Sequence, residues 1–297
     1  MKIPSATPTA IFNTDQSTPV TAAQISRMTM SNPTRPSFPI GMGSARGGRI
    51  TGGVAVFVGT SGWQYDDWRG RFYPKDLPKS EWLRHFSAEF PTVEVNNTFY
   101  QLPKEETFAS WREASADGFL ITIKASRYIT HIRRLRDCRD PVRLLWSRCR
   151  RLGKKLGPVL FQLPPNFRVD VDLLRNFVRV LPKTMRPALE FRHPSWESQE
   201  TYDTLDEAGC ALVLADRPGA RVPNVTTAGW SYIRFHQGTP VGPGYTRSKL
   251  RRWADRIAQT PAREIFVYFN NDTGGAAIRD ARALTDLLRR RGVDLPG

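Results

Sequence analysis

Glutamate, lysine, arginine and histidine residues gather toward the carboxyl ends of several β-rich runs in this sequence, and each type supports a different chemistry. A glutamate can act as a general base, which is the role we expect of Glu94 or Glu190. A lysine or a histidine can donate a proton, which is the role we expect of Lys124 or His236. Arginine binds anions through its fork of N–H donors. The arginines in these positions are Arg192 and Arg234.

These residues share one face of their predicted strands, because alternate side chains of a strand point to opposite sides. In a closed barrel that face looks into the lumen, where burying ionisable groups is costly unless they pair or line a wet cavity. We therefore expect a functional site, with a purely structural network of ion pairs as the alternative. The other polar residues assigned to this face, as ligand-binding residues, are Asn96, Gln162, Asp216 and Asn270.

Three of the four histidines, His131, His193 and His236, lie just beyond predicted strands. A single histidine in such a place is more often a cap or a packed residue, whereas three at the same end of the strands indicate a site. Together with the lysine and arginines named above, they would surround the two glutamates with positive charge. Such charge lowers the pKa of a carboxyl group and attracts an anionic ligand.

The last β-rich run is followed by the sequence NNDTGG, residues 270–275. Backbone N–H groups at such a loop commonly bind phosphate in barrel enzymes, so Asn271 and Asp272 are candidate ligand-binding residues. The alternative is that Asp272 or Thr273 only caps the final helix. Aromatic residues of the same loops, Tyr100 and Tyr245 among them, can stack on bases or sugars, although many such rings only pack against the fold.

Several enzyme classes lack their motifs here, because the sequence has no GxxxxGK[ST], no GxGxxG after the first run, no HExxH and no GxSxG. P-loop, Rossmann, zincin and α/β-hydrolase functions are therefore not indicated, and no nucleotide cofactor is assigned. The three cysteines form no CxxC pair, which argues against a disulfide scaffold, a zinc finger and an iron–sulfur cluster. A divalent metal stays open, but the surrounding lysine and arginine residues oppose a cation, so no metal ligand is assigned.

The β-rich runs alternate with amphipathic segments from residue 54 onward. Eight such units in about 240 residues predict a TIM-type (β/α)8 barrel, with an open doubly wound sheet as the alternative. Residues 217–229 lack a helical period, so we expect the barrel to be irregular there. The runs are residues 54–59, 92–96, 119–124, 158–163, 187–192, 210–216, 230–236 and 264–270. The predicted helices are residues 81–90, 105–114, 139–156, 171–180, 197–208, 247–259 and 276–290.

Residues 1–53 are rich in Ser, Thr, Pro and Gly and have no sustained apolar period. We predict a disordered extension there and a single barrel domain at residues 54–297. A plain tail or an early start codon explains this composition better than an organelle transit peptide. Because no apolar stretch is long enough to span a membrane and no secretory signal is visible, we expect a soluble, cytoplasmic protein.

The chain carries 44 Lys and Arg residues against 28 Asp and Glu residues, a formal net charge of +16 that favours anionic partners. The most basic stretch is residues 127–155, which begins at Arg127 and ends at Lys155. Such a stretch can bind nucleic acid by neutralising several phosphates. The alternative is a solvated helix face with no ligand.

Eight sequence blocks, in order, also resemble the family known as domain of unknown function 72, or YecE-like. The resemblance runs from about residue 56 to residue 290 and implies a TIM-barrel fold, while the family has no settled activity. Nucleic-acid processing has been suggested from the likeness of that fold to endonuclease-IV-like barrels, an argument from fold alone. The blocks are GTSGWQYDDW (59–68), FYP (72–74), EVNNTFYQLP (94–103), ITIKASRYITH (121–131), LFQLPPNF (160–167), EFRHPSW (190–196), YIRFHQG (232–238) and VYFNNDTGGAA (267–277).

These observations predict an enzyme, with hydrolase and lyase chemistry both open, that acts on an anionic or phosphate-bearing substrate at the carboxyl-terminal mouth of the barrel. A phosphorylated compound or a nucleic acid would fit the charge. The main alternative is a non-catalytic protein that binds nucleic acid through residues 127–155. A sensor or scaffold that binds a small anion without turnover is a third hypothesis.

Overall fold

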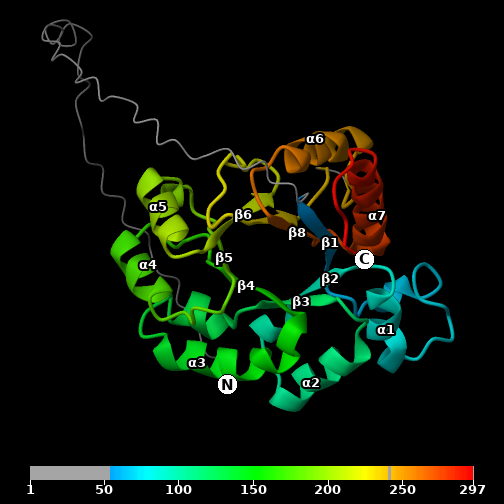
Figure 1. The fold of residues 1–297 in the computed structure, drawn as a ribbon, viewed down its shortest axis with the longest axis horizontal. Coiled ribbons are helices and arrows are strands. Elements are labelled where there is room, and N and C mark those ends of the chain that lie inside the picture. Colours follow the sequence, from blue (N-terminus) through cyan, green and yellow to red (C-terminus); the bar gives the residue numbers. More distant parts are fainter. Residues whose placement is uncertain (1–53, 240–241, 297) are drawn as a thin grey trace, which may run out of the picture. The chain divides into compact units, whose positions relative to one another are not determined.

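The computed structural model describes residues 54–239 and 242–296, in which eight parallel strands close into a barrel (Figure 1). The strands follow one another around the barrel in sequence order, and β1 pairs with β8, so the sheet is not open. Each strand coincides with one β-rich run, which confirms the predicted TIM-type barrel. The strands are β1 (Ala55–Ser61), β2 (Thr92–Val95), β3 (Leu120–Lys124), β4 (Leu156–Gln162), β5 (Pro187–Glu190), β6 (Ala211–Asp216), β7 (Ser231–Phe235) and β8 (Glu264–Phe269).

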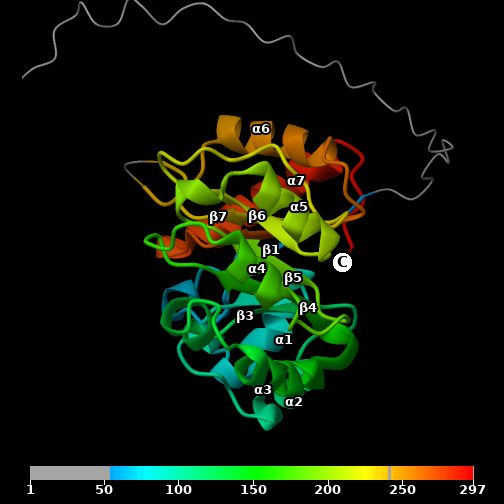
Figure 2. The same cartoon turned by 90° about the vertical axis from the view of Figure 1, so that its left-hand side faces the viewer.

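Helices surround the strands, as Figures 1 and 2 show from two directions. Their apolar stripes face the sheet: in the last helix Ala277, Ala281, Leu284 and Leu288 are all fully buried, as the periodicity predicts. The helices are α1 (Trp82–Ser87), α2 (Glu105–Ala114), α3 (Arg139–Cys149), α4 (Val171–Val178), α5 (Gln199–Glu207), α6 (Arg247–Ala258) and α7 (Ala276–Arg289).

The third helix is shorter than predicted. Instead of running to residue 156, α3 ends at Cys149 and a 3-10 segment, Arg150–Lys155, follows it. Within that segment Gly153 has φ 58° and ψ −128°, a conformation that a continuous α-helix does not contain. Leu156, which the helical pattern included, is instead the first residue of β4.

The barrel is irregular where the sequence predicts it. In the described chain a loop, residues 217–230, replaces a helix between β6 and β7. Strand β5 is short and pairs with β6 only through Ala188–Ala211 and Leu189–Leu212. On its other side β6 stays paired with β7 as far as Asp216. The carboxyl-terminal half of β6 therefore has a free edge toward β5.

The lumen contains two layers of different character. Its apolar layer holds aromatic rings, among which Phe57 and Phe266 stack with their centroids 5.0 Å apart. Buried charged residues, Glu94, Glu190 and Arg234, lie nearer the carboxyl ends of the strands. A second and larger apolar core separates the strands from the helices. Because the apolar layer fills the lower lumen, a ligand can reach the charged layer only from the carboxyl-terminal mouth.

The predicted disordered extension, residues 1–53, lies outside the described residues. Among the described helices, none combines the length and the apolar character that crossing a lipid bilayer requires.

Candidate functional site

A three-residue ion network lies inside the barrel. Arg234 of β7 donates from Nη1 to Oε2 of Glu190 at 2.6 Å and from Nη2 to Oε1 of Glu94 at 2.7 Å. Glu94 lies on β2 and Glu190 on β5, so the guanidinium joins strands from different sides of the lumen. The three side chains are at most 1% exposed. The network contains two carboxylates and one guanidinium, so the buried charges pair with one another.

Glu94 accepts hydrogen bonds from two residues besides Arg234. Its Oε1 also accepts a hydrogen bond from Ser61 at 2.7 Å, and its Oε2 accepts one from the Tyr232 hydroxyl at 2.5 Å. Burial alone would raise the pKa of Glu94, but the Arg234 charge and these hydrogen bonds hold it below its ordinary value. A fully buried carboxylate with a lowered pKa is poorly suited to take a proton from a ligand. The geometry therefore gives Glu94 a supporting position beneath the site.

Glu190 connects the network to a histidine at the mouth. Its Oε1 accepts a hydrogen bond from Gln162 Nε2 at 2.9 Å and lies 3.5 Å from Nε2 of His236. Burial raises the pKa of Glu190, but Arg234 and His236 outweigh burial and place it well below the ordinary value. Since the side chain of His236 is 18% exposed, its ring links a buried carboxylate to the open end of the barrel.

Two asparagine side chains extend the polar network on the other side of the His236 ring. Asn270 Nδ2 lies 3.3 Å from His236 Nδ1, and Asn270 Oδ1 accepts from Asn96 Nδ2 at 3.4 Å. Among the described residues the buried Asn96 Oδ1 has no hydrogen-bond partner. Turning both amides over would let Asn270 donate to Asn96 Oδ1 and accept from Nδ1–H of His236. The chain of amides can thus accommodate either protonation state of the imidazole.

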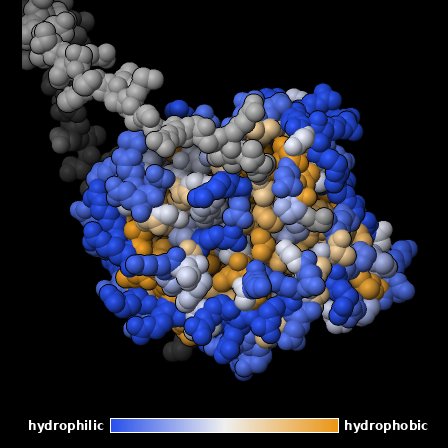
Figure 3. All heavy atoms as spheres, viewed as in Figure 1, coloured by the Kyte–Doolittle hydropathy of each residue, from blue (hydrophilic) through white to orange (hydrophobic). Residues whose placement is uncertain are grey.

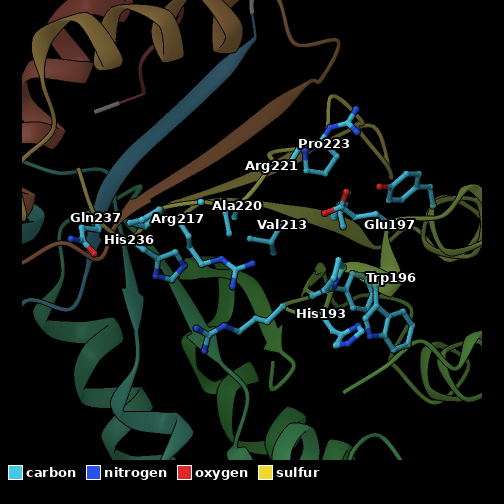
Figure 4. Close-up of a pocket in the computed structure, with 18 residues that line it drawn as sticks. His193, Trp196, Glu197, Val213, Arg217, Ala220, Arg221, Pro223, His236 and Gln237 are labelled. Carbon is cyan, nitrogen blue, oxygen red and sulfur yellow. The ribbon is translucent and has the colours of Figure 1, made fainter. Parts of the chain in front are cut away.

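A pocket of about 810 Å³ opens beside this network, between the end of β5 and the loop after β6 (Figure 4). It occupies the gap where β6 is unpaired with β5. The lining has three arginines against a single acidic residue, Glu197, and the side chains of His236 and Arg217 point into the same space. Its basic residues are Arg192, His193, Arg217, Arg221 and His236.

Arg217 is the pocket residue whose surroundings most favour an anion. In the described structure its buried Nε atom has no hydrogen-bond partner. Burial lowers the pKa of Arg217, and the charges of Arg192 and Arg234 act in the same direction, against Glu190. A guanidinium that has lost water without gaining an acceptor is stabilised by an incoming carboxylate or phosphate. The pocket is therefore suited to a small anion.

Lys124 ends β3 at the mouth and is half-buried. Its Nζ lies 4.5 Å from the centroid of the Phe99 ring, and the edge of the His131 ring packs against the same ring at 4.9 Å. Burial, with the Arg234 charge next in effect, lowers the pKa of Lys124 to about 8. Burial and then Lys124 also lower the pKa of His131. Lys124 and His131 thus belong to one electropositive mouth.

Comparison with known proteins identifies the fold family. The family model described as "Protein of unknown function DUF72" matches residues 57–296. The chain belongs to the DUF72 family. The UPF0759 protein YecE of Escherichia coli is 31% identical over 167 residues, which are 54% of this chain and 59% of that protein. The UPF0759 protein YunF of Bacillus subtilis is 26% identical over 270 residues, covering 78% of this chain and 94% of that one.

A crystal structure of a DUF72 family protein from Thermotoga maritima has the same fold, with a TM-score of 0.72 and 27% identity. The match covers 79% of this chain and 99% of the Thermotoga chain. The resemblance found in the sequence is therefore confirmed over the whole barrel. The Escherichia coli match covers less than two thirds of that relative's own length.

Three of the predicted ligand-binding residues of this DUF72 chain lie outside the site. Asp216 points away from the lumen and accepts from Lys249 Nζ at 2.8 Å and from Trp253 Nε1 at 2.7 Å, both in α6. Its strand reads ALVLAD, and a nearly all-apolar run gives no alternation from which to assign faces. Tyr245 is buried edge-on against Phe235 at 5.0 Å.

Asn271 is the third of these residues. It donates to the Pro243 carbonyl and to Asp280, both at 2.7 Å, so it fastens the end of β8 to α7 and to the loop before α6. Asp272 does not cap the final helix, since its carboxylate accepts from Trp68 Nε1 at 2.7 Å. Burial raises the pKa of Asp272 to about 7. The alternative of a simple helix cap is therefore wrong for Asp272.

His193 and Tyr100 lie at the rim. His193 Nδ1 is 2.8 Å from the Ser195 hydroxyl and caps the 3-10 turn Pro194–Trp196, although its ring still lines the pocket. Tyr100 is 74% exposed, beside Phe99. Arg217 lines the pocket but is not among the site residues predicted from the sequence. Its position directly after a strand could have indicated a site residue. Arg217 lies, however, in the segment for which the sequence predicts only irregular structure.

Part of the basic segment, residues 127–155, is used to hold the fold together. Arg148 donates to the carbonyls of Leu102 and Pro103, and Lys155 donates to those of Arg112 and Ser115. Arg151 pairs with Glu105. Hydrophilic side chains cover much of the face seen in Figure 3. In the described residues no group of three or more His, Cys, Asp or Glu side chains is placed to hold a metal ion.

Proposed function

We propose that this DUF72 protein is an enzyme that acts on a small anionic or phosphate-bearing substrate in the pocket beside β5 and β6. The observation that carries the proposal is the convergence of Arg192, Arg217 and His236 on one pocket, with Arg217 Nε lacking a partner among the described residues. Arginine side chains that lack acceptors in a partly water-excluded pocket bind carboxylate and phosphate well. In barrel enzymes, sites lie at this end of the strands.

Arg192 and Arg217 would bind the anionic group of the substrate. Arg234 would not touch the substrate, because it is 1% exposed and both of its Nη atoms are used by glutamates. Arg234 is a positioning residue that fixes Glu190 under the histidine. This division of roles differs from the expectation that Arg234 itself binds the anion.

His236 would move the proton. Glu190 lies behind the His236 ring, with its Oε1 3.5 Å from Nε2. Asn270 beside Nδ1 can donate to the neutral ring or accept from the charged one. These contacts support a general acid or general base at His236, with Glu190 acting through it.

A thermal-shift measurement on the full chain tests this proposal, because a ligand that binds only the folded state raises the melting temperature. We expect inorganic phosphate or a sugar phosphate to raise it, and Arg217→Ala to remove most of the effect. Arg150→Ala is the matched control, since Arg150 is exposed and lies in the 3-10 segment after α3. Equal shifts in the wild type and Arg217→Ala would overturn the assignment of the pocket.

A second function, binding of nucleic acid, is favoured by a specific surface at the start of the basic segment. Tyr128 and Ile132 are 44% and 58% exposed, and the guanidinium of Arg133 lies 5.6 Å from the Tyr128 ring centroid. An exposed ring with arginines beside it suits an unpaired base and its phosphate. Tyr128→Ala together with Arg133→Glu would then abolish a salt-dependent gel shift with single-stranded RNA, while Arg217→Ala would bind normally.

A further inference from the structure

Lys124 occupies a position that the acid–base and anion-binding roles do not use. Two residues earlier on β3, the Thr122 hydroxyl lies 2.6 Å from the Tyr268 hydroxyl inside the lumen. Because side chains two apart on a strand share a face, Lys124 extends from that same face into the barrel mouth. The aromatic face of Phe99 lies 4.5 Å from its Nζ. The amine is thus aimed at the open end of the barrel.

The surroundings of this amine differ from those of paired lysines. Lys79 and Lys249 have carboxylate oxygens within 2.8 Å, whereas in the described structure no carboxylate oxygen lies within 4.0 Å of Lys124 Nζ. Burial lowers the pKa of Lys124 to about 8, and the positive charges of Arg234 and Arg192 add to the effect despite the two glutamates. A pKa of about 8 leaves roughly a quarter of the amine uncharged at pH 7.5, against about one part in a thousand for an ordinary lysine.

We propose that Lys124 is a nucleophilic amine that forms a Schiff base with a small anionic aldehyde or ketone held at the barrel mouth. The proposal rests on the proposed function, because Arg192, which lines the pocket and whose charge acts on Lys124, would attract the anionic group of the same molecule. A desolvated lysine near cationic groups is the arrangement that activates amines toward carbonyl compounds.

The step balances without an oxidant or a reductant. The nitrogen lone pair of Lys124 forms a bond to the carbonyl carbon, and the nitrogen loses one proton while the carbonyl oxygen takes one up, which gives a neutral carbinolamine. That hydroxyl then leaves as water with one further proton, and a C=N bond replaces the C=O bond. The protonated imine withdraws electrons from the neighbouring carbon, so a bond to that carbon can break. This chemistry belongs to the lyase class, one of the two expected from the sequence.

Phe99 and His131 would support this step by shielding the amine. The Phe99 ring has Nζ over its face and the His131 ring against it at 84°, so these aromatic groups replace water on one side of Lys124. An amine that is shielded from water has a lower pKa, and an imine formed there is better protected from hydrolysis.

Reductive trapping on the full chain tests the proposal. The protein is incubated at pH 7.5 with glyoxylate, an anionic aldehyde, or with the neutral acetaldehyde, and sodium borohydride then reduces any imine to a stable amine. Peptide mass mapping of the wild type locates the adduct. We expect Lys124 to be labelled by glyoxylate at least about tenfold more than any exposed lysine, because far more of this amine is uncharged.

Two variants complete the test. Lys124→Arg keeps the positive charge but removes the nucleophile, so the main adduct should disappear, whereas Lys154→Arg, which changes an exposed lysine, should keep it. Labelling spread evenly over exposed lysines would overturn the inference. A phosphate-induced thermal shift without any Lys124 adduct would overturn the Schiff base alone. A Lys124 adduct formed equally by acetaldehyde and glyoxylate, with no phosphate shift, would instead overturn the proposed anion site.

Discussion

Nη1 of Arg234 lies 2.6 Å from Oε2 of Glu190, and both side chains are completely enclosed by the barrel. The same guanidinium reaches Glu94 with its other Nη atom. One cation therefore neutralises carboxylates from two strands on different sides of the lumen, and it fixes the carboxylate that faces His236. The stability of the barrel and the proposed chemistry of its mouth therefore involve the same contact.

Replacing Arg234 with methionine should destabilise the protein by about 3–5 kcal/mol, because two buried carboxylates would lose their only cation within the network. Urea unfolding followed by circular dichroism measures the change. As a control, Arg289→Met removes an exposed pair with Asp286 and should leave the unfolding midpoint almost unchanged. Similar midpoints for the two variants would show that the network contributes little.

Stability should fall steeply in acid. The pKa values of Glu94 and Glu190 are lowered in the folded state, so these carboxylates bind protons more readily once the chain unfolds. The stabilisation that the ionised carboxylates give the folded protein is complete above about pH 4.5, the pKa of an unfolded glutamate. It is lost as the pH falls below that value. We expect the melting temperature to drop from pH 5 to pH 3, and Glu94→Gln to flatten that drop. An unchanged slope in the variant would contradict the assignment.

Asp272 should produce the opposite dependence. Because burial raises its folded pKa from 3.8 to about 7, the folded state binds the proton more tightly than the unfolded state does. The stabilisation from protonated Asp272 is present below pH 3.8 and is lost as the pH rises toward about 7.

Asp272→Asn can still accept the hydrogen bond from Trp68, but it cannot ionise. The melting temperature of the variant relative to the wild type should therefore increase between pH 5 and pH 8. A constant difference in melting temperature across that range would show that ionisation of Asp272 does not destabilise the folded protein.

His236→Gln should reduce turnover of an anionic carbonyl substrate by about 100-fold or more while leaving the substrate bound, because removing a general acid or base costs about two to four orders of magnitude. Steady-state kinetics would show the loss in kcat with little change in KM. Arg192→Ala should instead raise KM, since Arg192 is expected to hold the anion. A higher KM with an unchanged kcat in His236→Gln would contradict its role in proton transfer.

The barrel itself could be predicted from the sequence, because each strand is a short β-rich run and several helices, α6 and α7 among them, have a regular apolar stripe. The faces of β2, β5 and β7 were also predictable, since polar and apolar residues alternate there around Glu94, Glu190 and Arg234. In contrast, β6 is nearly all apolar before Asp216, so its inward face was assigned wrongly.

The pocket could not be predicted, because it depends on how far two neighbouring strands stay paired. β5 ends at Glu190, which leaves the edge of β6 free, while the pairing of Asp216 with Phe235 places Arg217 beside His236. The sequence around Arg217 contains no pattern that indicates where the pairing between β5 and β6 ends. The contacts of Lys124 with Phe99 likewise arise from chain segments that follow different strands.

The loop of residues 217–230 takes the place of a helix, and its consequence concerns the evolution of the family. Glu94, Glu190 and Arg234 lie on strands that the whole barrel holds in place, whereas Arg217 comes from this loop. Under the proposed function, insertions, deletions or substitutions in the loop would therefore change the anion-binding residues without altering the buried charge network. A barrel of this kind would in this way change its substrate while its buried charges stay in place.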